Sequence, residues 1–420
     1  MGSSLVSNFR EKVSKIKDAG INRSAEFDVQ YSTGFLGLDY LNGTVVHVQS
    51  EDRSFTYNSL GIVDGSANTI IGRSNSGKST FTIQVIGNII RPFIKKGLPT
   101  GIFIDDIEGS LPMVRKAFLL EFSEKELEEY VDVRNTGITT ENVMQRIKAL
   151  HDEKVNNRKK YEYDTGLFDV YGNKIYKLIP TIYMIDSLPM LLPKDLTEEE
   201  ELGGSMSASS IAKSNTMLSK QIIQLCKESG IILFTINHIL DEIQMGFIPK
   251  AAQIAGLKQG ERLPGGKAAM YLANNMFRLD DSTMLKASEG FGIDGSIVSL
   301  TIIKSRTNAT RRSIPLIFNK SEGKFDDTLS LFQLLKNEGV FKGAGSYQYV
   351  DGCEDIKFSQ KTFKEVLSTS PELQKAFASE CLKVLKGLLS DTKVQTGEFN
   401  TVHDNIVDII NQLSNGELVG

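Results

Sequence analysis

Residues 72–80 read Gly72-Arg73-Ser74-Asn75-Ser76-Gly77-Lys78-Ser79-Thr80, and this stretch decides the fold. It follows the short apolar run Thr69-Ile70-Ile71 and precedes a segment whose isoleucines and valine lie at helical spacing. A G-x-x-x-x-G-K-[ST] pattern between a strand and a helix is the phosphate-binding loop known as the P-loop or Walker A motif. Backbone N–H groups of such a loop surround phosphate oxygens, and the helix N-terminus adds a favourable dipole. The stretch therefore predicts an α/β protein that binds ATP and Mg²⁺.

Individual residues of the loop have separate expected roles. Gly72 and Gly77 permit the tight turn and the close approach of the backbone to phosphate. Lys78 is expected to reach the β- and γ-phosphates, and Ser79 to place its hydroxyl on Mg²⁺. The alternative, a chance glycine-rich turn, does not explain the strand before the loop and the helix after it.

Outward from the loop, the region 33–335 alternates short apolar runs with helical patterns. Strands that alternate with helices favour a mostly parallel, twisted sheet flanked by helices. The clearest helix is expected over 209–229, with Gly230 ending it. The runs interpreted as strands are 69–71, 100–105, 179–186, 231–237, 274–280, 298–304 and 314–319.

Two polar, turn-rich stretches interrupt this core, at 44–61 and 151–178, and both are interpreted as insertions of unassigned role. The second contains a segment at 169–175 that is typical of a small hairpin.

Segments on both sides of the core have helical patterns. Residues 1–32 are interpreted as an N-terminal oligomerisation arm, and 336–420 as a helical C-terminal subdomain. Ser370-Pro371 is typical of a helix start, because serine caps the first turn and proline is tolerated at the first helical position. The apolar stripes are Leu5, Phe9, Val13 and Ile16; Leu373, Phe377, Cys381 and Leu385; and Val402, Ile406, Ile409 and Leu413.

Composition excludes several classes of protein. The formal net charge of −4 opposes attraction of the whole molecule to nucleic acid, although a local basic path stays open. The cysteines and histidines are scattered, so neither a disulfide framework nor a zinc site is indicated. No stretch approaches the roughly 20 apolar residues of a membrane span, and the first residues do not resemble a signal peptide. We expect a cytoplasmic protein that does not use a membrane.

An acidic residue follows each of two further apolar strands. The strand Ile182-Tyr183-Met184-Ile185 ends in Asp186, which has the Walker B form and is expected to hold Mg²⁺ through water. The strand 101–104 is followed by Asp105, Asp106 and Glu108 near the carboxyl edge of the sheet, where ligands bind in open α/β folds. We expect Glu108 to orient the attacking water; the alternatives are a strand-end cap at Asp186 and solvated acids after strand 101–104.

A histidine occupies a similar position on another strand. The apolar run Phe234-Thr235-Ile236 ends in Asn237 and His238, two side chains placed to sense a γ-phosphate. A purely structural histidine is the open alternative.

The order of these elements resembles the RecA family of recombinases, especially the phage UvsX type. The likeness begins before the P-loop, where residues 31–43 read YSTGFLGLDYLNG and match the family's "STG…LD…L.G" lead-in, and it extends to about 345. His238 stands where bacterial members carry glutamine and the phage type carries histidine. The resemblance implies a RecA-like P-loop ATPase core.

The resemblance also implies contacts with DNA. Residues 200–206 are similar to the family's first DNA-binding loop, and 239–264 occupy the place of the second. Basic residues would contact phosphates, apolar residues would wedge between bases, and a glycine pair would close the second loop; a solvated helix face and ordinary packing are the alternatives. The implied DNA-contacting residues are Met206, Lys213, Lys220, Ile243, Gly265 and Gly266.

Lys304-Ser305-Arg306-Thr307 matches the family's paired basic residues. The resemblance implies that Lys304 and Arg306 reach the ATP of a neighbouring protomer and stabilise charge as an arginine finger does. Surface charge is the alternative interpretation.

The expected function is an ATP-dependent recombinase that forms a helical filament on single-stranded DNA and exchanges strands with homologous double-stranded DNA. Its other expected partners are further copies of the chain and mediator or single-strand-binding proteins. A hexameric helicase motor and a regulatory ATPase outside DNA metabolism stay open, because a fold alone does not choose a function.

Overall fold

The computed structural model describes residues 29–49, 54–109, 111–169, 173–195, 217–218, 220–241, 256–264, 270, 273–343 and 346–395. The predicted helices at 5–16 and 402–413 lie outside these residues. No helix within them has both the length and the apolar character needed to cross a bilayer.

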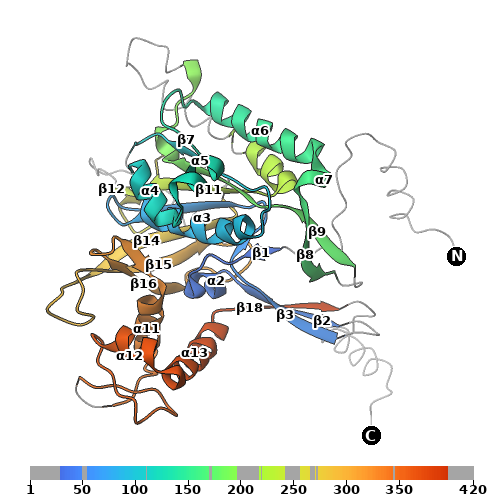
Figure 1. Cartoon of the computed structure of the whole chain (residues 1–420). Coiled ribbons are helices and arrows are strands. Elements are labelled where there is room, and N and C mark those ends of the chain that lie inside the picture. The colour runs from blue at the N-terminus through green and yellow to red at the C-terminus, as the bar shows by residue number, and fades with distance from the viewer. Residues whose placement is uncertain are drawn as a thin grey trace, which may run out of the picture.

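A nine-stranded sheet forms the centre of the molecule, in the order β17-β16-β15-β14-β5-β11-β10-β6-β7 (Figure 1). Neighbours from β14 to β7 pair in parallel, whereas β14 to β17 pair antiparallel. The sheet is therefore mostly parallel, as predicted. Its strands are β5 (Ala67–Gly72), β6 (Ile102–Asp106), β7 (Val131–Arg134), β10 (Thr181–Asp186), β11 (Ile231–His238), β14 (Asn275–Leu285), β15 (Gly295–Lys304), β16 (Ser313–Asn319) and β17 (Lys324–Asp326).

Helices cover both faces of this sheet. The helices are α2 (Leu36–Leu41), α3 (Lys78–Lys95), α4 (Met113–Leu120), α5 (Glu124–Tyr130), α6 (Thr140–Asn156), α7 (Arg158–Tyr161), α11 (Asp327–Asn337), α12 (Phe363–Thr369) and α13 (Pro371–Lys386). Residues 217–218 and 220–229 are also helical, and the 3₁₀ turn η1 spans Leu188–Met190. The predicted end of the helix at Gly230 is confirmed, because Gly230 adopts a positive φ of 65°.

The alternation of side chains along β10 explains the layers. Ile182 and Met184 join the apolar cluster built around α2, α3 and α11, while Tyr183 and Ile185 join the cluster built around α6 and residues 217–229. Successive strand residues point to opposite faces, so a continuous apolar run serves two cores. Strand β5, which precedes the glycine-rich residues 72–77, lies between β14 and β11, near the middle of this sandwich.

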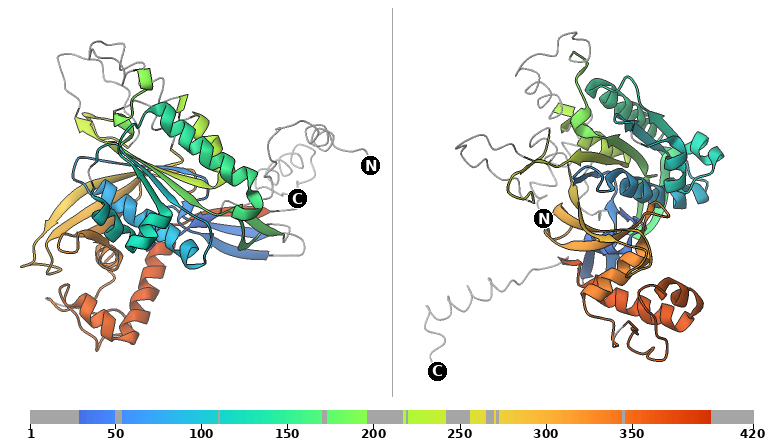
Figure 2. Two further views of the ribbon diagram at one scale, coloured as in Figure 1. Left: turned by 45° about the horizontal axis from the view of Figure 1, so that its top comes forward. Right: turned by 90° about the vertical axis from the view of Figure 1, so that its left-hand side faces the viewer.

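Smaller sheets extend from the core. β1 (Gln30–Tyr31) pairs with β4 (Ile62–Val63), β8 (Glu162–Phe168) with β9 (Lys174–Leu178), and β12 (Leu240–Asp241) with β13 (Glu261–Arg262). β2 (Thr44–Gln49) pairs antiparallel with β3 (Ser54–Ser59) and parallel with β18 (Ser390–Gln395). Figure 2 shows α12 and α13 as a lobe that projects away from the large sheet.

The seven predicted strands are all present, and the start of α13 is confirmed. The Ser370 side chain accepts a hydrogen bond from the Leu373 backbone N–H, and the predicted stripe of four apolar residues on this helix is buried. Two stretches differ from the turn-rich interpretation. Residues 44–61 contain the β2–β3 hairpin, and 151–156 continue α6 before the predicted hairpin appears as β8–β9.

Candidate functional site

Residues 72–80, called the P-loop here for their sequence pattern, run from the end of β5 into the start of α3, so the predicted strand, turn and helix are present. Gly77 is the N-cap of α3 and has a φ of 82°, a conformation that glycine adopts without the usual steric penalty. A Cβ on Gly72 would come within 2.6 Å of both the Leu279 carbonyl oxygen and Ser76 Oγ. Both glycines are therefore required by the turn itself.

The Arg73 carbonyl organises the interior of this loop. Lys78 Nζ donates to it at 2.6 Å and Ser76 Oγ donates to it at 2.9 Å. Lys78 is buried, with 5% of its surface exposed. A bound phosphate would compete with the Arg73 carbonyl for the Lys78 ammonium.

Asp186 ends β10 beside the start of α3. Ser79 Oγ donates to Asp186 Oδ2 at 2.7 Å, while Asp186 Oδ1 is buried and has no hydrogen-bond partner among the described residues. Burial raises the pKa of Asp186 to about 6; the Ser79 hydrogen bond opposes this shift, and the nearby carboxylates Glu108 and Asp106 add to it. A hydroxyl and an unpartnered carboxylate oxygen together form a donor set that fits Mg²⁺.

The two acids that end β6 have structural partners. Asp105 Oδ2 accepts from the Tyr183 hydroxyl at 2.5 Å, and its Oδ1 accepts from Arg146 Nη2 at 2.6 Å. Asp106 forms a buried ion pair with Lys116 at 2.6 Å. Buried charges are stable when paired and hydrogen-bonded, so Asp105 serves the fold. Asp106 is paired through Oδ2, while its Oδ1 is buried and has no hydrogen-bond partner among the described residues.

Glu108 differs from both acids because its partners, Ser187 and His238, lie at the carboxyl ends of β10 and β11. Glu108 Oε1 accepts from Ser187 Oγ at 2.5 Å and lies 2.8 Å from His238 Nε2. Partial burial acts to raise the pKa of Glu108, but the hydrogen bonds from Ser187 and His238, together with electrostatic attraction to His238 and Lys78, outweigh it and hold the pKa below its ordinary value. Glu108 is therefore an ionised carboxylate near neutral pH, suited to orient a water molecule.

His238 lies beside the P-loop because β11 pairs in parallel with β5. The register places His238 opposite Gly72. The carboxyl ends of β5, β6, β10 and β11 share one edge, where α/β folds bind ligands. The structure thus brings residues 72–80, Glu108, Asp186 and His238 together.

Ser187 belongs to this group but was not predicted. Its only sequence signal is its position directly after the Walker B aspartate. A serine there is chemically unremarkable until β6 and β10 pair and place Asp106 beside Asp186, which brings Glu108 within reach of Ser187.

Lys304 and Arg306 lie at the opposite edge of the sheet. Lys304 pairs with Met276 across β15 and β14, and Met276 pairs with Thr69 across β14 and β5. Lys304 is therefore two strands away from β5 and three residues back from Gly72, about 10 Å in each direction. Lys304 Nζ donates to the Met270 carbonyl at 2.5 Å. Neither cation joins the P-loop of its own chain.

Most of the implied DNA-contacting residues fall outside the described residues: Met206, Lys213, Ile243, Gly265 and Gly266. Lys220 is described. It is exposed on the helix whose Leu218, Ile222 and Cys226 are buried against the sheet.

No protein-family model matches this chain, and the comparison with curated proteins finds no match.

Proposed function

We propose that this chain is a RecA-type, ATP-dependent DNA recombinase that acts in the cytoplasm as a filament on single-stranded DNA. One observation carries the proposal. The P-loop, Asp186, Glu108 and His238 converge at one edge of the sheet, while Lys304 and Arg306 lie at the other. A site whose phosphate-binding pattern and carboxylates lie at one edge, and whose paired basic residues lie at the other, favours completion by a second copy of the chain.

The residues at the P-loop edge divide the work of hydrolysis. Ser79 and Asp186 would hold Mg²⁺, which neutralises charge on the phosphates of ATP. Lys78 binds the β- and γ-phosphates. Glu108 positions the attacking water. His238 holds Glu108 in place and also contacts the γ-phosphate.

A second copy contributes Lys304 and Arg306 in the proposed filament. These cations would supply charge to the γ-phosphate as an arginine finger does. Because different surfaces of each copy meet, the contact repeats head to tail and generates a filament or a ring.

The loop that carries the two cations is well anchored within its own chain. Thr307 Oγ1 donates to the Asn42 carbonyl at 2.9 Å, and Ser305 Oγ donates to Asn275 Oδ1 at 3.1 Å. Asn308 Nδ2 donates to the Leu388 carbonyl at 2.7 Å. A cation delivered to a neighbouring site needs such positioning, because catalysis depends on geometry fixed before the reaction.

DNA binding in this proposal adds many weak contacts along the filament. Lys220 is exposed and available to a phosphate, and the second loop at 239–264 would supply further contacts. An acidic chain binds DNA in this way because multivalent attachment raises the total affinity. Strand exchange with homologous double-stranded DNA, with mediator or single-strand-binding proteins as helpers, would follow from such a filament.

The deciding experiment measures ATP turnover with and without single-stranded DNA and images the same samples by negative stain. We expect DNA to raise turnover and filaments to form, and Lys78→Ala to abolish turnover. Turnover that ignores DNA, together with closed rings in place of filaments, would overturn the recombinase proposal. The absence of any nucleotide binding would overturn the proposal that the chain is an ATPase.

A further inference from the structure

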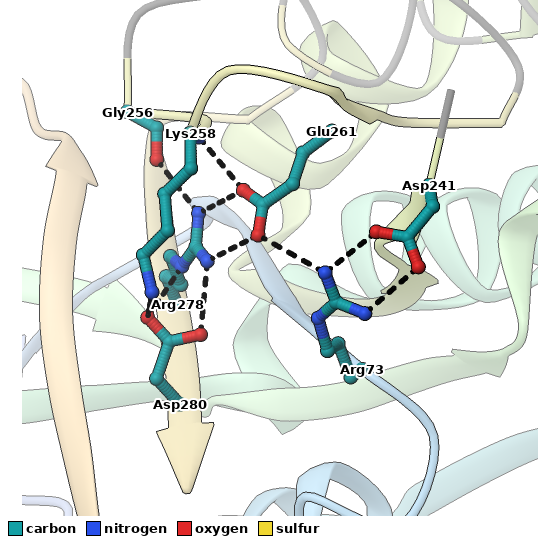
Figure 3. A network of polar contacts seen from close by, with 7 residues as sticks. All are labelled: Arg73, Asp241, Gly256, Lys258, Glu261, Arg278 and Asp280. Atoms are coloured by element: carbon teal, nitrogen blue, oxygen red, sulfur yellow. Dashed lines mark hydrogen bonds and ion pairs between the residues drawn. The ribbon is translucent and has the colours of Figure 1, made fainter. Parts of the chain in front are cut away.

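A network of six charged side chains ties the P-loop to the β12–β13 hairpin (Figure 3). Its anchor is Arg278 on β14, whose side chain is 4% exposed. Arg278 donates to Glu261, Asp280 and the Gly256 carbonyl over 2.6–3.1 Å. These contacts use all five N–H donors of the guanidinium. A buried and fully bonded arginine holds Glu261 and its hairpin firmly on the core.

Arg73 joins the other end of the network. Its Nη1 and Nη2 donate to Asp241 Oδ2 and Oδ1 at 3.0 and 2.6 Å, and Nη2 lies 3.7 Å from Glu261 Oε1. The two-pronged geometry fixes the guanidinium against one carboxylate. Figure 3 shows Arg73 pointing from the P-loop towards both acids of the hairpin.

Arg73 therefore contacts both the P-loop, through its backbone, and the β12–β13 hairpin, through its side chain. Its carbonyl accepts from Lys78, the residue expected to bind the phosphates, and its side chain holds Asp241. Asp241 and Glu261 close the hairpin whose ends lie within 239–264, the range implied to contact DNA.

We propose that Arg73 is a positioning residue that couples nucleotide binding at the P-loop to DNA binding through Asp241 and Glu261. The inference rests on the proposed function. Phosphate would draw Lys78 away from the Arg73 carbonyl, and the resulting change at residue 73 would move Asp241 through the guanidinium. Coupling between two ligands is reciprocal, so DNA would alter nucleotide affinity by the same factor.

The measured quantity is a ratio of affinities. The dissociation constant of a fluorescein-labelled oligo-dT is determined by anisotropy with and without a non-hydrolysable ATP analogue. We expect the wild type to bind oligo-dT more tightly with the analogue. Arg73→Ala and Asp241→Asn should each reduce that ratio by about fivefold, a change within the usual range of coupling between sites. Arg73→Lys keeps the charge but loses the two-pronged contact with Asp241, so its ratio should fall between those of the wild type and Arg73→Ala.

The double variant Arg73→Ala/Asp241→Asn separates a shared link from two independent effects. It should reduce the ratio no further than either single change, because residues acting through one contact are not additive. Asp351→Asn is the matched control: it removes another exposed aspartate that pairs with a cation at 2.6 Å, Lys342, and should leave the ratio unchanged.

Each remaining outcome has one meaning. Wild-type coupling that survives both single changes would overturn this inference and leave the proposed function intact. Additive losses in the double variant would also overturn it. A wild type that binds both ligands without coupling would overturn the inference, and one that binds neither ligand would overturn the proposed function as well.

Discussion

The two edges of the central sheet contain different chemistry. At the carboxyl ends of β5, β10 and β11, a cationic P-loop meets Asp186 and Glu108, and the side chains bond to one another. At the other edge, the loop after β15 presents Lys304 and exposed Arg306 on a scaffold of neutral asparagine and serine groups. In the proposed function, the first edge is the catalytic site and the second edge is the part supplied to another chain. The predictions below test this division, from the largest expected effect to the smallest.

The strongest test asks whether the second edge works on another chain. Lys304→Ala should reduce DNA-dependent turnover by about a thousandfold, as loss of an arginine finger does, without weakening ATP binding by the separate chain. Mixing Lys304→Ala with Lys78→Ala should restore activity at about a quarter of the junctions in an equimolar random filament, where the two intact surfaces meet. Turnover in a mixing series checks this. No recovery at any ratio would count against action between chains.

Glu108→Gln tests the first edge alone. The amide keeps a hydrogen-bonding group near Ser187 and His238 but lacks the charge that orients water, so turnover should fall by about a hundredfold while ATP binding stays. Single-turnover kinetics and nucleotide titration separate the two quantities. Glu162→Gln, in a surface pair with Arg158 at 2.8 Å, is the matched control. Equal turnover in both variants would remove Glu108 from the mechanism.

Asn42→Ala tests the scaffold of the second edge. Asn42 is fully buried; its side chain donates to the Gly61 carbonyl at 2.7 Å and accepts from Thr307 Oγ1 at 3.2 Å. Its loss removes the donor to the buried Gly61 carbonyl, and the free energy of unfolding should fall by about 1–3 kcal/mol. Denaturant unfolding measures this. Turnover should fall in the filament more than ATP affinity falls; a parallel loss of both would contradict a specific effect on the loop.

Asp39→Asn gives the smallest effect, and it depends on pH. Burial raises the pKa of Asp39 from 3.8 to about 6 against hydrogen bonds from Ser32 and Thr33. The folded state thus holds the proton more tightly than the unfolded chain, so this group favours folding most below pH 3.8 and loses that contribution as pH rises through 6. The asparagine variant should gain about 1–2 kcal/mol of unfolding free energy at pH 8 and nothing at pH 4. Denaturant titrations at both pH values measure this, and a gain independent of pH would be inconsistent with it.

Local patterns predicted the sheet well because its strands are apolar and bounded by turns. The P-loop, the Ser370 cap and the stripe on α13 each depend on residues close in sequence. Asp186 and His238 were found for the same reason, since each directly follows a strong strand.

The extension of α6 was missed because a lysine takes an apolar position. Val143, Ile147 and Lys154 are buried on this helix, and Lys154 Nζ donates to the Ile179 carbonyl at 2.7 Å and to Thr181 Oγ1 at 3.0 Å. In a sequence pattern a lysine counts as polar, so the helical periodicity of the buried positions is not visible at residue 154. Burial lowers the pKa of Lys154 to about 7.

Contacts between residues far apart in the chain could not be predicted from sequence patterns. Ser187 meets Glu108, Arg73 meets Asp241, and β18 pairs with β2, each across a separation that periodicity does not encode. Register and three-dimensional proximity decide these contacts, not the identity of neighbours in the chain.

The parallel pairing of β18 with β2 also constrains the order in which the chain folds during synthesis. Thr44 meets Ser390, so the hairpin made early waits for a strand made about 350 residues later, on the order of half a minute at usual rates of translation. The loop that carries Lys304 is fastened to Leu388 by Asn308 and Arg312. In the proposed filament, a nascent chain therefore lacks the finished surface for a neighbour until residues 388–395 have been made and have folded.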